Sequence, residues 1–294
     1  AQVGHVGLDL DVAGHRAIMP HRSQRHLPRR AKVAPRSETT RRMNAPHRTR
    51  PPRTEQQVRI DLAAAYRMAA LNGWDDTIYT HLSASVPGEP GHYLLNPFGA
   101  TFDEITASSL VKVDVHGRVV DGSGAPVNPS GFAIHGAVHA ARPEVECVIH
   151  LHTPWGVALS MLPNGLQPTS QYAMRLHQRL GRHAYEGLAL GADEQQRLVQ
   201  DLGELDGLIL ENHGTLVVGR TVAEAWMLMH LLERAAQAQL RAMAAAGGSV
   251  PMVSKELAQR TYEEWVGDGS VWDGDIEWQP LLRRLDRTSP GYRD

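Results

Sequence analysis

The 294-residue chain contains a single cysteine, Cys147, so it forms no intrachain disulfide and offers a metal at most one thiolate. It lacks any run of the roughly 18 uninterrupted apolar residues that a membrane helix needs. The glycine-rich motifs of nucleotide-binding loops are also missing. We therefore expect a globular protein without a membrane partner, and a reducing, cytoplasmic setting fits the scarcity of cysteine.

The net charge of −2 combines two unlike segments. Residues 1–54 carry 12 Arg or Lys but only three acidic residues, and show no hydrophobic periodicity. Such a segment buries too little apolar surface to offset its ordering entropy, so we expect residues 1–53 to be a disordered basic extension. It is interpretable as a transit peptide, a nucleic-acid-binding arm or a non-functional stretch ahead of a start at Met43. The acidic remainder gives no electrostatic case for a nucleic-acid partner.

Residues 54–266 show the pattern of a folded domain, followed by a tail at 267–294 that is rich in Trp and Asp. Periodicity and capping residues predict helices at 55–73, 130–145, 153–162, 192–205, 221–247 and 254–266. Short apolar or alternating runs predict strands at 77–86, 92–97, 109–120, 147–152 and on both sides of the turn within 207–219. This irregular alternation favours an α/β protein with a three-layer α/β/α architecture and a mixed or mainly antiparallel central sheet.

The stretch "CVIHLHTP" places two histidines, His150 and His152, at i and i+2 of a predicted buried strand. Strand geometry directs both rings to the same face, close enough to share a metal ion. In "LENHGTLVVG", His213 ends an apolar strand just before Gly214 and is a candidate third ligand. The spacing alone does not distinguish this role from that of a turn histidine bonded to the local backbone.

Taken together, "CVIHLHTPWGVALS", "ENHGTLVVG", "GWDDTIYTHLSASVPG" and "NPSGFAIHGAVHAARPEV" resemble the class II aldolase/adducin family over roughly residues 55–245. The resemblance implies a mainly antiparallel central sheet and a divalent metal, usually zinc, held by three histidines. These ligands fall on His150, His152 and His213. The family's aldolases use the metal as a Lewis acid when a carbon–carbon bond breaks, and they are commonly homotetramers.

The chain departs from the aldolase pattern where the family places its catalytic glutamate, because Gly131 stands there. The family's phosphate-binding positions are altered too: His81 replaces an asparagine and Phe98 precedes Gly99 where the family has a Thr-Gly pair. Of two expected serines, Ser130 is present and Pro129 replaces the other. We therefore expect a small substrate that is not phosphorylated.

His135 and His139, at i and i+4 of one predicted helix, are the candidate replacements for the missing carboxylate. Three functions remain open. The chain is a zinc-dependent lyase acting on a hydroxy-carbonyl compound, an Fe(II) oxygenase or decarboxylase on the same scaffold, or an adducin-like assembly domain without catalysis. The presence of all three metal ligands favours an enzyme.

Overall fold

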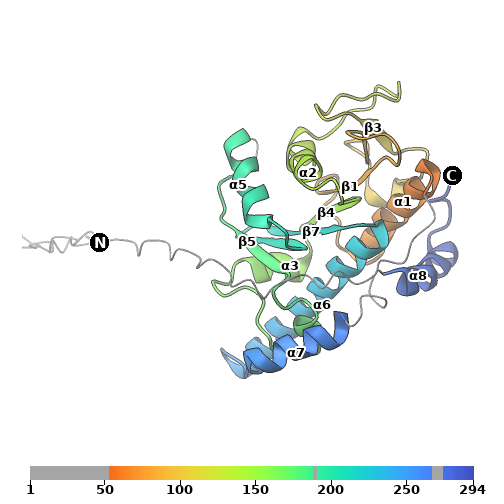
Figure 1. Ribbon diagram of the computed structural model, residues 1–294. Helices are drawn as coiled ribbons and strands as arrows, with labels where there is room; N and C mark the ends of the chain where they lie inside the picture. Colours follow the sequence, from red (N-terminus) through yellow and green to blue (C-terminus); the bar gives the residue numbers. More distant parts are fainter. Residues whose placement is uncertain (1–52, 188–190, 267–273) are drawn as a thin grey trace, which may run out of the picture. The chain divides into compact units, whose positions relative to one another are not determined.

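The computed structural model describes residues 53–187, 191–266 and 274–294, which all belong to one compact unit spanning 43–294 (Figure 1). Apart from Arg53, the expected basic extension at 1–53 lies outside the described residues. The strands are β1 (His81–Ser85), β2 (Tyr93–Leu95), β3 (Val111–Val113), β4 (Cys147–Leu151), β5 (Leu180–His183), β6 (Gly207–Leu210) and β7 (Gly214–Gly219). The helices are α1 (Glu55–Leu71), the 3₁₀ helix η1 (Phe102–Glu104), α2 (Pro129–Ala141), α3 (Pro154–Ser160), α4 (Gln171–Met174), α5 (Ala192–Leu202), α6 (Val222–Ala246), α7 (Lys255–Val266) and α8 (Asp275–Thr288).

The strands form a seven-stranded sheet in the order β3-β2-β1-β4-β7-β6-β5. Each neighbouring pair is antiparallel except β5 and β6, which are parallel. In the centre of the sheet, β4 aligns His150 with His81 of β1 on one side and with Leu216 of β7 on the other. The expected mainly antiparallel sheet is confirmed.

Helices cover both faces of this sheet, as expected for three layers (Figure 1). On one face α1, α3 and α6 pack against alternate strand residues such as Leu82 and Ile149. On the other face α2 and α5 pack against Val148, Leu208 and Leu216. Because neighbouring strand residues point to opposite faces, His81 and His150 project to the side that α2 covers.

Capping residues define where several of these helices begin, as the sequence predicted. Thr54 and Gln57 form a capping box at α1. The Thr153 side chain accepts a hydrogen bond from the backbone of Gly156, with Pro154 at the first position of α3. Thr221 caps α6 in the same way. Among these, the α3 cap directly follows β4 and so fixes the chain just beyond His152.

The region expected to be a tail contains helix α8, which the sequence analysis did not predict. Trp278, Leu282 and Leu285 of α8 are buried, and α8 packs against α1 and α6. The indole N–H of Trp278 donates a hydrogen bond to Asp61 at 2.9 Å. Strand β5 and helix α4 were also missed. None of the helices in the described ranges has the length and apolar character to cross a membrane.

Candidate metal centre

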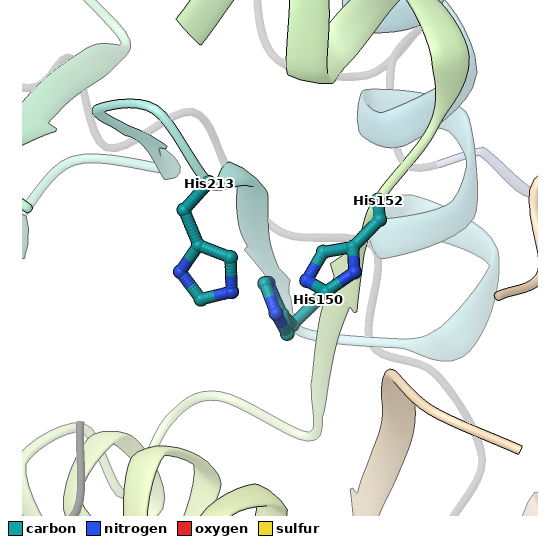
Figure 2. A group of neighbouring side chains, drawn as sticks. All are labelled: His150, His152 and His213. Carbon is teal, nitrogen blue, oxygen red and sulfur yellow. The ribbon is translucent and has the colours of Figure 1, made fainter. Parts of the chain in front are cut away.

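Three histidine rings from two separate chain segments meet at one end of the sheet centre (Figure 2). His150 lies on β4, His152 follows the end of that strand, and His213 lies in the turn between β6 and β7. Each offers a ring nitrogen, and these atoms lie within 4.8 Å of one another. The ring centroids are 4.8 to 5.0 Å apart. Rings this close can share one cation.

The outer nitrogens of two of these rings are held by protein acceptors. His150 Nδ1 lies 3.1 Å from the Thr215 carbonyl oxygen, and His152 Nδ1 lies 2.9 Å from Asp76 Oδ2. Since a carbonyl and a carboxylate only accept, both Nδ1 atoms carry the hydrogen, and in the neutral form of each ring the lone pair lies on Nε2. His152 Nε2 is buried and has no hydrogen-bond partner in the described part of the chain. A metal ligand needs such a free lone pair, so the donor set fits a divalent ion.

Unusual backbone conformations lie on both sides of the cluster. Thr80, just before His81, has φ of 64°, and Asn212, just before His213, has φ of 55°. Thr80 is β-branched, so this conformation is costly at that position, whereas asparagine tolerates it. The positive φ beside His213 thus belongs to Asn212 and not to Gly214. A Cβ on Gly214 would lie 2.8 Å from the Leu151 carbonyl oxygen, so close approach of two strands explains this glycine.

A second group of buried histidines adjoins the cluster between β1 and α2. His81 Nδ1 lies 2.9 Å from His135 Nε2, and His135 Nδ1 lies 2.7 Å from Ser83 Oγ. Ser83 Oγ lies 2.8 Å from His139 Nε2, and His139 Nδ1 lies 3.3 Å from Ser85 Oγ. The sequence placed His135 and His139 on one helix face, and both point to β1. Their four ring nitrogens are therefore engaged by protein groups.

Gly131 lies against the His81 ring. A Cβ built at position 131 would lie 2.3 Å from Cδ2 and 2.6 Å from Nε2 of His81. The imidazole of His81 thus occupies the space into which any side chain at position 131 would project. The His81 ring centroid is 5.5 Å from that of His150, so His81 is adjacent to the three-histidine cluster.

Burial keeps these imidazoles neutral. It lowers the pKa of His213 to about 4 and the pKa of His81 to about 3, assisted in both cases by neighbouring histidines. It also lowers the pKa of His139 to about 4 and holds the pKa values of His135 and His150 well below 6.5. Neutral imidazole is the form that binds metals, so the burial is compatible with the proposed ligand role.

A recess next to His213 contains a further histidine that the sequence analysis did not single out. It is lined by residues that include Ile134, His183, Tyr185, Glu194, Glu211 and His213. His183 Nδ1 lies 2.9 Å from Asp201 Oδ2, and its Nε2 is buried without a partner in the described residues. Glu211, two residues before His213, pairs with Arg182 at 2.9 Å.

The remaining predicted substrate residues are Phe98, Gly99 and Ser130. The Phe98 ring is 6.4 Å from the ring of Tyr79, in the turn that carries Asp76. Gly99 has φ of 104° and open space where a side chain would project. Ser130 is the second residue of α2, and its side chain lies outside the described part of the structure. Cys147 is buried.

Sequence reasoning missed Asp76 and His183 for the same physical reason. Asp76 lies in an irregular turn with only an isolated bridge to Tyr79, so no periodicity relates it to His152. His183 belongs to β5, a four-residue strand without alternating hydrophobicity. The one available signal was composition, since Asp beside buried His is a common pairing at metal sites.

Comparison with known proteins gives consistent matches. Residues 60–240 match the model for the Class II Aldolase and Adducin N-terminal domain. A Caulobacter vibrioides protein of the aldolase class 2 group is 49% identical over 240 residues, which cover 82% of this chain and 93% of that protein. Rat alpha-adducin is 39% identical over 252 residues; the match covers 81% of this chain but only 34% of alpha-adducin.

Solved structures agree with these relatives. An aldolase II superfamily protein from Pseudomonas syringae has a TM-score of 0.76 and 43% identity, with 82% of this chain and 96% of that one covered. The L-fuculose 1-phosphate aldolase of Glaciozyma antarctica has a TM-score of 0.72 and 30% identity, with 83% and 97% covered. The similarity therefore extends over nearly the whole of each matched structure.

Proposed function

Because this chain belongs to the class II aldolase and adducin family, we propose that it is a cytoplasmic, metal-dependent lyase. Its substrate is a small hydroxy-carbonyl compound that is not phosphorylated, in which it cleaves or forms a carbon–carbon bond. The observation that carries the proposal is the meeting of ring nitrogens of His150, His152 and His213 within 4.8 Å, with the buried Nε2 of His152 left without a partner among the described residues. These residues would hold one divalent ion, zinc in first place and Fe(II) as the alternative. When bound, the ion supplies Lewis-acid polarisation of the substrate carbonyl.

The chain's own groups prepare this site before substrate enters. The Asp76 carboxylate and the Thr215 carbonyl orient two of the ligand rings through their Nδ1 hydrogens. Hydrogen bonds of this kind fix a ring's tautomer and raise its basicity as a ligand. The recess beside His213 has the free Nε2 of His183 on its wall.

His135 and His139 are proposed to act through His81 rather than on the substrate. Both nitrogens of each ring are hydrogen-bonded to His81, Ser83 or Ser85, so neither ring has a free atom to offer. His81 is the member of this group next to the metal cluster. We therefore assign His135 and His139 as positioning residues.

The second candidate function is an assembly domain without catalysis, favoured by the identity to alpha-adducin and by glycine at position 131. An Fe(II) oxygenase is the third. Metal analysis separates them: zinc supports the lyase, oxygen-sensitive iron supports the oxygenase, and the absence of any bound metal supports the assembly domain.

The direct test is turnover of aldol-type substrates by the zinc-loaded protein, with unphosphorylated and phosphorylated hydroxy-carbonyl compounds assayed side by side. We expect cleavage of an unphosphorylated compound that stops on chelation, returns with zinc and is absent from His150→Ala. His177→Ala, which alters a half-buried histidine outside the cluster, is the matched control and keeps full activity. Activity that survives both chelation and His150→Ala would contradict the proposal.

The proposed enzyme is a homotetramer, as is common among the family's aldolases. Light scattering coupled to size-exclusion chromatography measures the mass directly. The expected mass is four times the 32.3 kDa of the chain. A monomer at micromolar concentration would contradict this part of the proposal.

A further inference from the structure

The buried hydrogen-bond chain between β1 and α2 has a defined direction, which is set at its far end. Ser85 Oγ donates to the Val145 carbonyl oxygen at 3.2 Å. A carbonyl oxygen only accepts, and a serine has one hydroxyl hydrogen. The remaining contact of Ser85, to His139 Nδ1, must therefore use a hydrogen from the histidine. Reversing it would leave the Val145 carbonyl without that hydrogen, which is costly for a buried group.

This direction passes from ring to ring. A neutral imidazole carries one hydrogen, so His139 with Nδ1–H accepts at Nε2 from the Ser83 hydroxyl. Ser83 Oγ then accepts from His135 Nδ1–H. His135 Nε2 in turn accepts from His81 Nδ1–H. Each step has only one outcome once the previous hydrogen is placed.

The hydrogen-bond chain consequently ends with a lone pair on His81 Nε2. No hydrogen bond to this atom is formed within the described part of the protein, although every other side-chain polar atom in the hydrogen-bond chain is paired. The ring lies beside His150, and Gly131 leaves room for it because a Cβ there would lie 2.6 Å from Nε2. The position of this lone pair is thus set by the buried residues His81, Ser83, His135 and His139, together with Ser85.

We propose that His81 Nε2 is a specificity-determining acceptor that binds a hydroxyl hydrogen of the substrate and disfavours an anionic oxygen at the same point. An uncharged hydroxyl brings the hydrogen that this atom needs. A phosphate or carboxylate oxygen would meet one lone pair with another. This inference rests on the proposed function and names the substrate group at one position of that site.

The first test reads the tautomers without any enzymatic assay. Nitrogen-15 NMR of histidine-labelled, zinc-free protein distinguishes Nδ1–H from Nε2–H rings, and single His→Gln variants assign the signals. We expect His81, His135 and His139 all to be Nδ1–H tautomers. Ser83→Ala, which interrupts the chain, is expected to give His81 a mixture of both. An Nε2–H signal from His81 in the unmodified protein would overturn the proposal.

The second test measures ligand binding by calorimetry with zinc-loaded protein, using dihydroxyacetone and inorganic phosphate as probes. Ser83→Ala is expected to weaken dihydroxyacetone binding about tenfold, the effect of losing one well-oriented hydrogen bond. Ser160→Ala changes a buried serine of α3 that does not belong to the hydrogen-bond chain, and it is expected to leave binding unchanged. His81→Asn supplies a donor and is expected to tighten phosphate binding about tenfold. Unchanged affinities in both chain variants would overturn the proposal.

Zinc affinity separates this inference from the proposed function. If His81 is a substrate acceptor, His81→Asn keeps zinc affinity within about threefold. A hundredfold loss would instead make His81 a metal ligand and overturn the acceptor role. If the protein binds no zinc at all, the proposed function is wrong. The tautomer measurement on zinc-free protein still tests the state of His81 independently.

Discussion

At the residue scale, the relation between Gly131 and His81 shows that two departures from the family pattern are coupled. The His81 ring occupies the space into which a side chain at position 131 would project. Restoring glutamate at position 131 alone would therefore collide with His81. This steric dependence joins residues fifty positions apart on different elements, so no local pattern in the sequence could reveal it.

Gly131→Ala is expected to lower the free energy of unfolding by about 1–3 kcal/mol, the usual cost of overpacking. In a His81→Asn background the smaller side chain should recover about 1 kcal/mol or more of that loss. Urea denaturation of the four proteins measures this coupling. Gly136→Ala in the same helix meets only the tip of the Phe132 ring and is the control, expected to be neutral or stabilising. Purely additive effects would show that the two residues do not compete for space.

Asp76→Asn should weaken zinc binding about 10- to 100-fold, because it removes the carboxylate that orients His152. The Asp76 side chain is 46% exposed, so the fold should be unaffected. Competition with a chromophoric chelator measures the affinity. Asp75→Asn changes the neighbouring carboxylate and should have no effect, and equal losses in both variants would refute the specific role of Asp76.

Residue-scale prediction from sequence succeeded where geometry is local. Strand alternation alone indicated that His150 and His152 share a face, and the structure confirms this arrangement (Figure 2). The convergence of His213 depends on how β7 pairs with β4, which is a long-range contact. The family resemblance, rather than spacing, selected that residue.

At the scale of elements, we expect the packing of α2 against β1 to depend on pH. Burial lowers the pKa of His139 to about 4, and its ring contacts Ser83, Ser85 and the stacked ring of Tyr93, none of which carries a carboxylate. The unfolded chain, with a histidine pKa near 6.5, binds the proton more tightly. The contribution of neutral, buried His139 to the free energy of unfolding is therefore fully present above pH 6.5. It falls as the pH decreases towards 4 and changes no further below that.

We expect each such histidine to contribute a slope of about 1.4 kcal/mol per pH unit between pH 6 and 4.5. Urea denaturation of metal-free protein at a series of pH values measures it. His139→Gln should reduce the slope by one proton, whereas a variant of the exposed His116 should not. A stability independent of pH over this range would contradict the buried, neutral state of His139.

Helix α8 anchors the C-terminal segment through Trp278, which is 3% exposed and donates to Asp61. Trp278→Ala should cost about 3–5 kcal/mol in the free energy of unfolding, because it leaves a large cavity and removes a partner of a partly buried carboxyl. Ile276→Ala, at a position that is 65% exposed on the same helix, should change stability by less than about 0.5 kcal/mol. Chemical denaturation compares them, and a small effect of Trp278→Ala would mean that α8 docks weakly.

The elements that sequence analysis missed have identifiable reasons. Helix α8 lies in the segment rich in Trp and Asp that was expected to be a tail, yet Trp278, Leu282 and Leu285 follow helical spacing. Strand β5 pairs in parallel with β6, at the edge of the sheet, and has no alternation of its own. By contrast, α1 and α6 carry both periodicity and capping residues, and were predicted correctly.

At the scale of the whole molecule, the sheet order brings distant segments into one site. Strand β4 lies between β1 and β7, so the His81 group and the turn carrying His213 meet on either side of His150. The two sheet faces have separate cores, which lets α2 deliver polar histidines without interrupting the apolar packing of α1 and α6. The pattern of helices and strands in the sequence predicted the fold class. It did not predict the strand order, on which the meeting of these segments depends.

The central claim is that these three imidazoles bind one cation, and anomalous diffraction at the zinc edge from crystals of the zinc-loaded protein tests it most directly. We expect one strong peak per chain, about 2.0–2.1 Å from a ring nitrogen of each of His150, His152 and His213. Crystals that hold zinc elsewhere, with no peak among these rings, would contradict it.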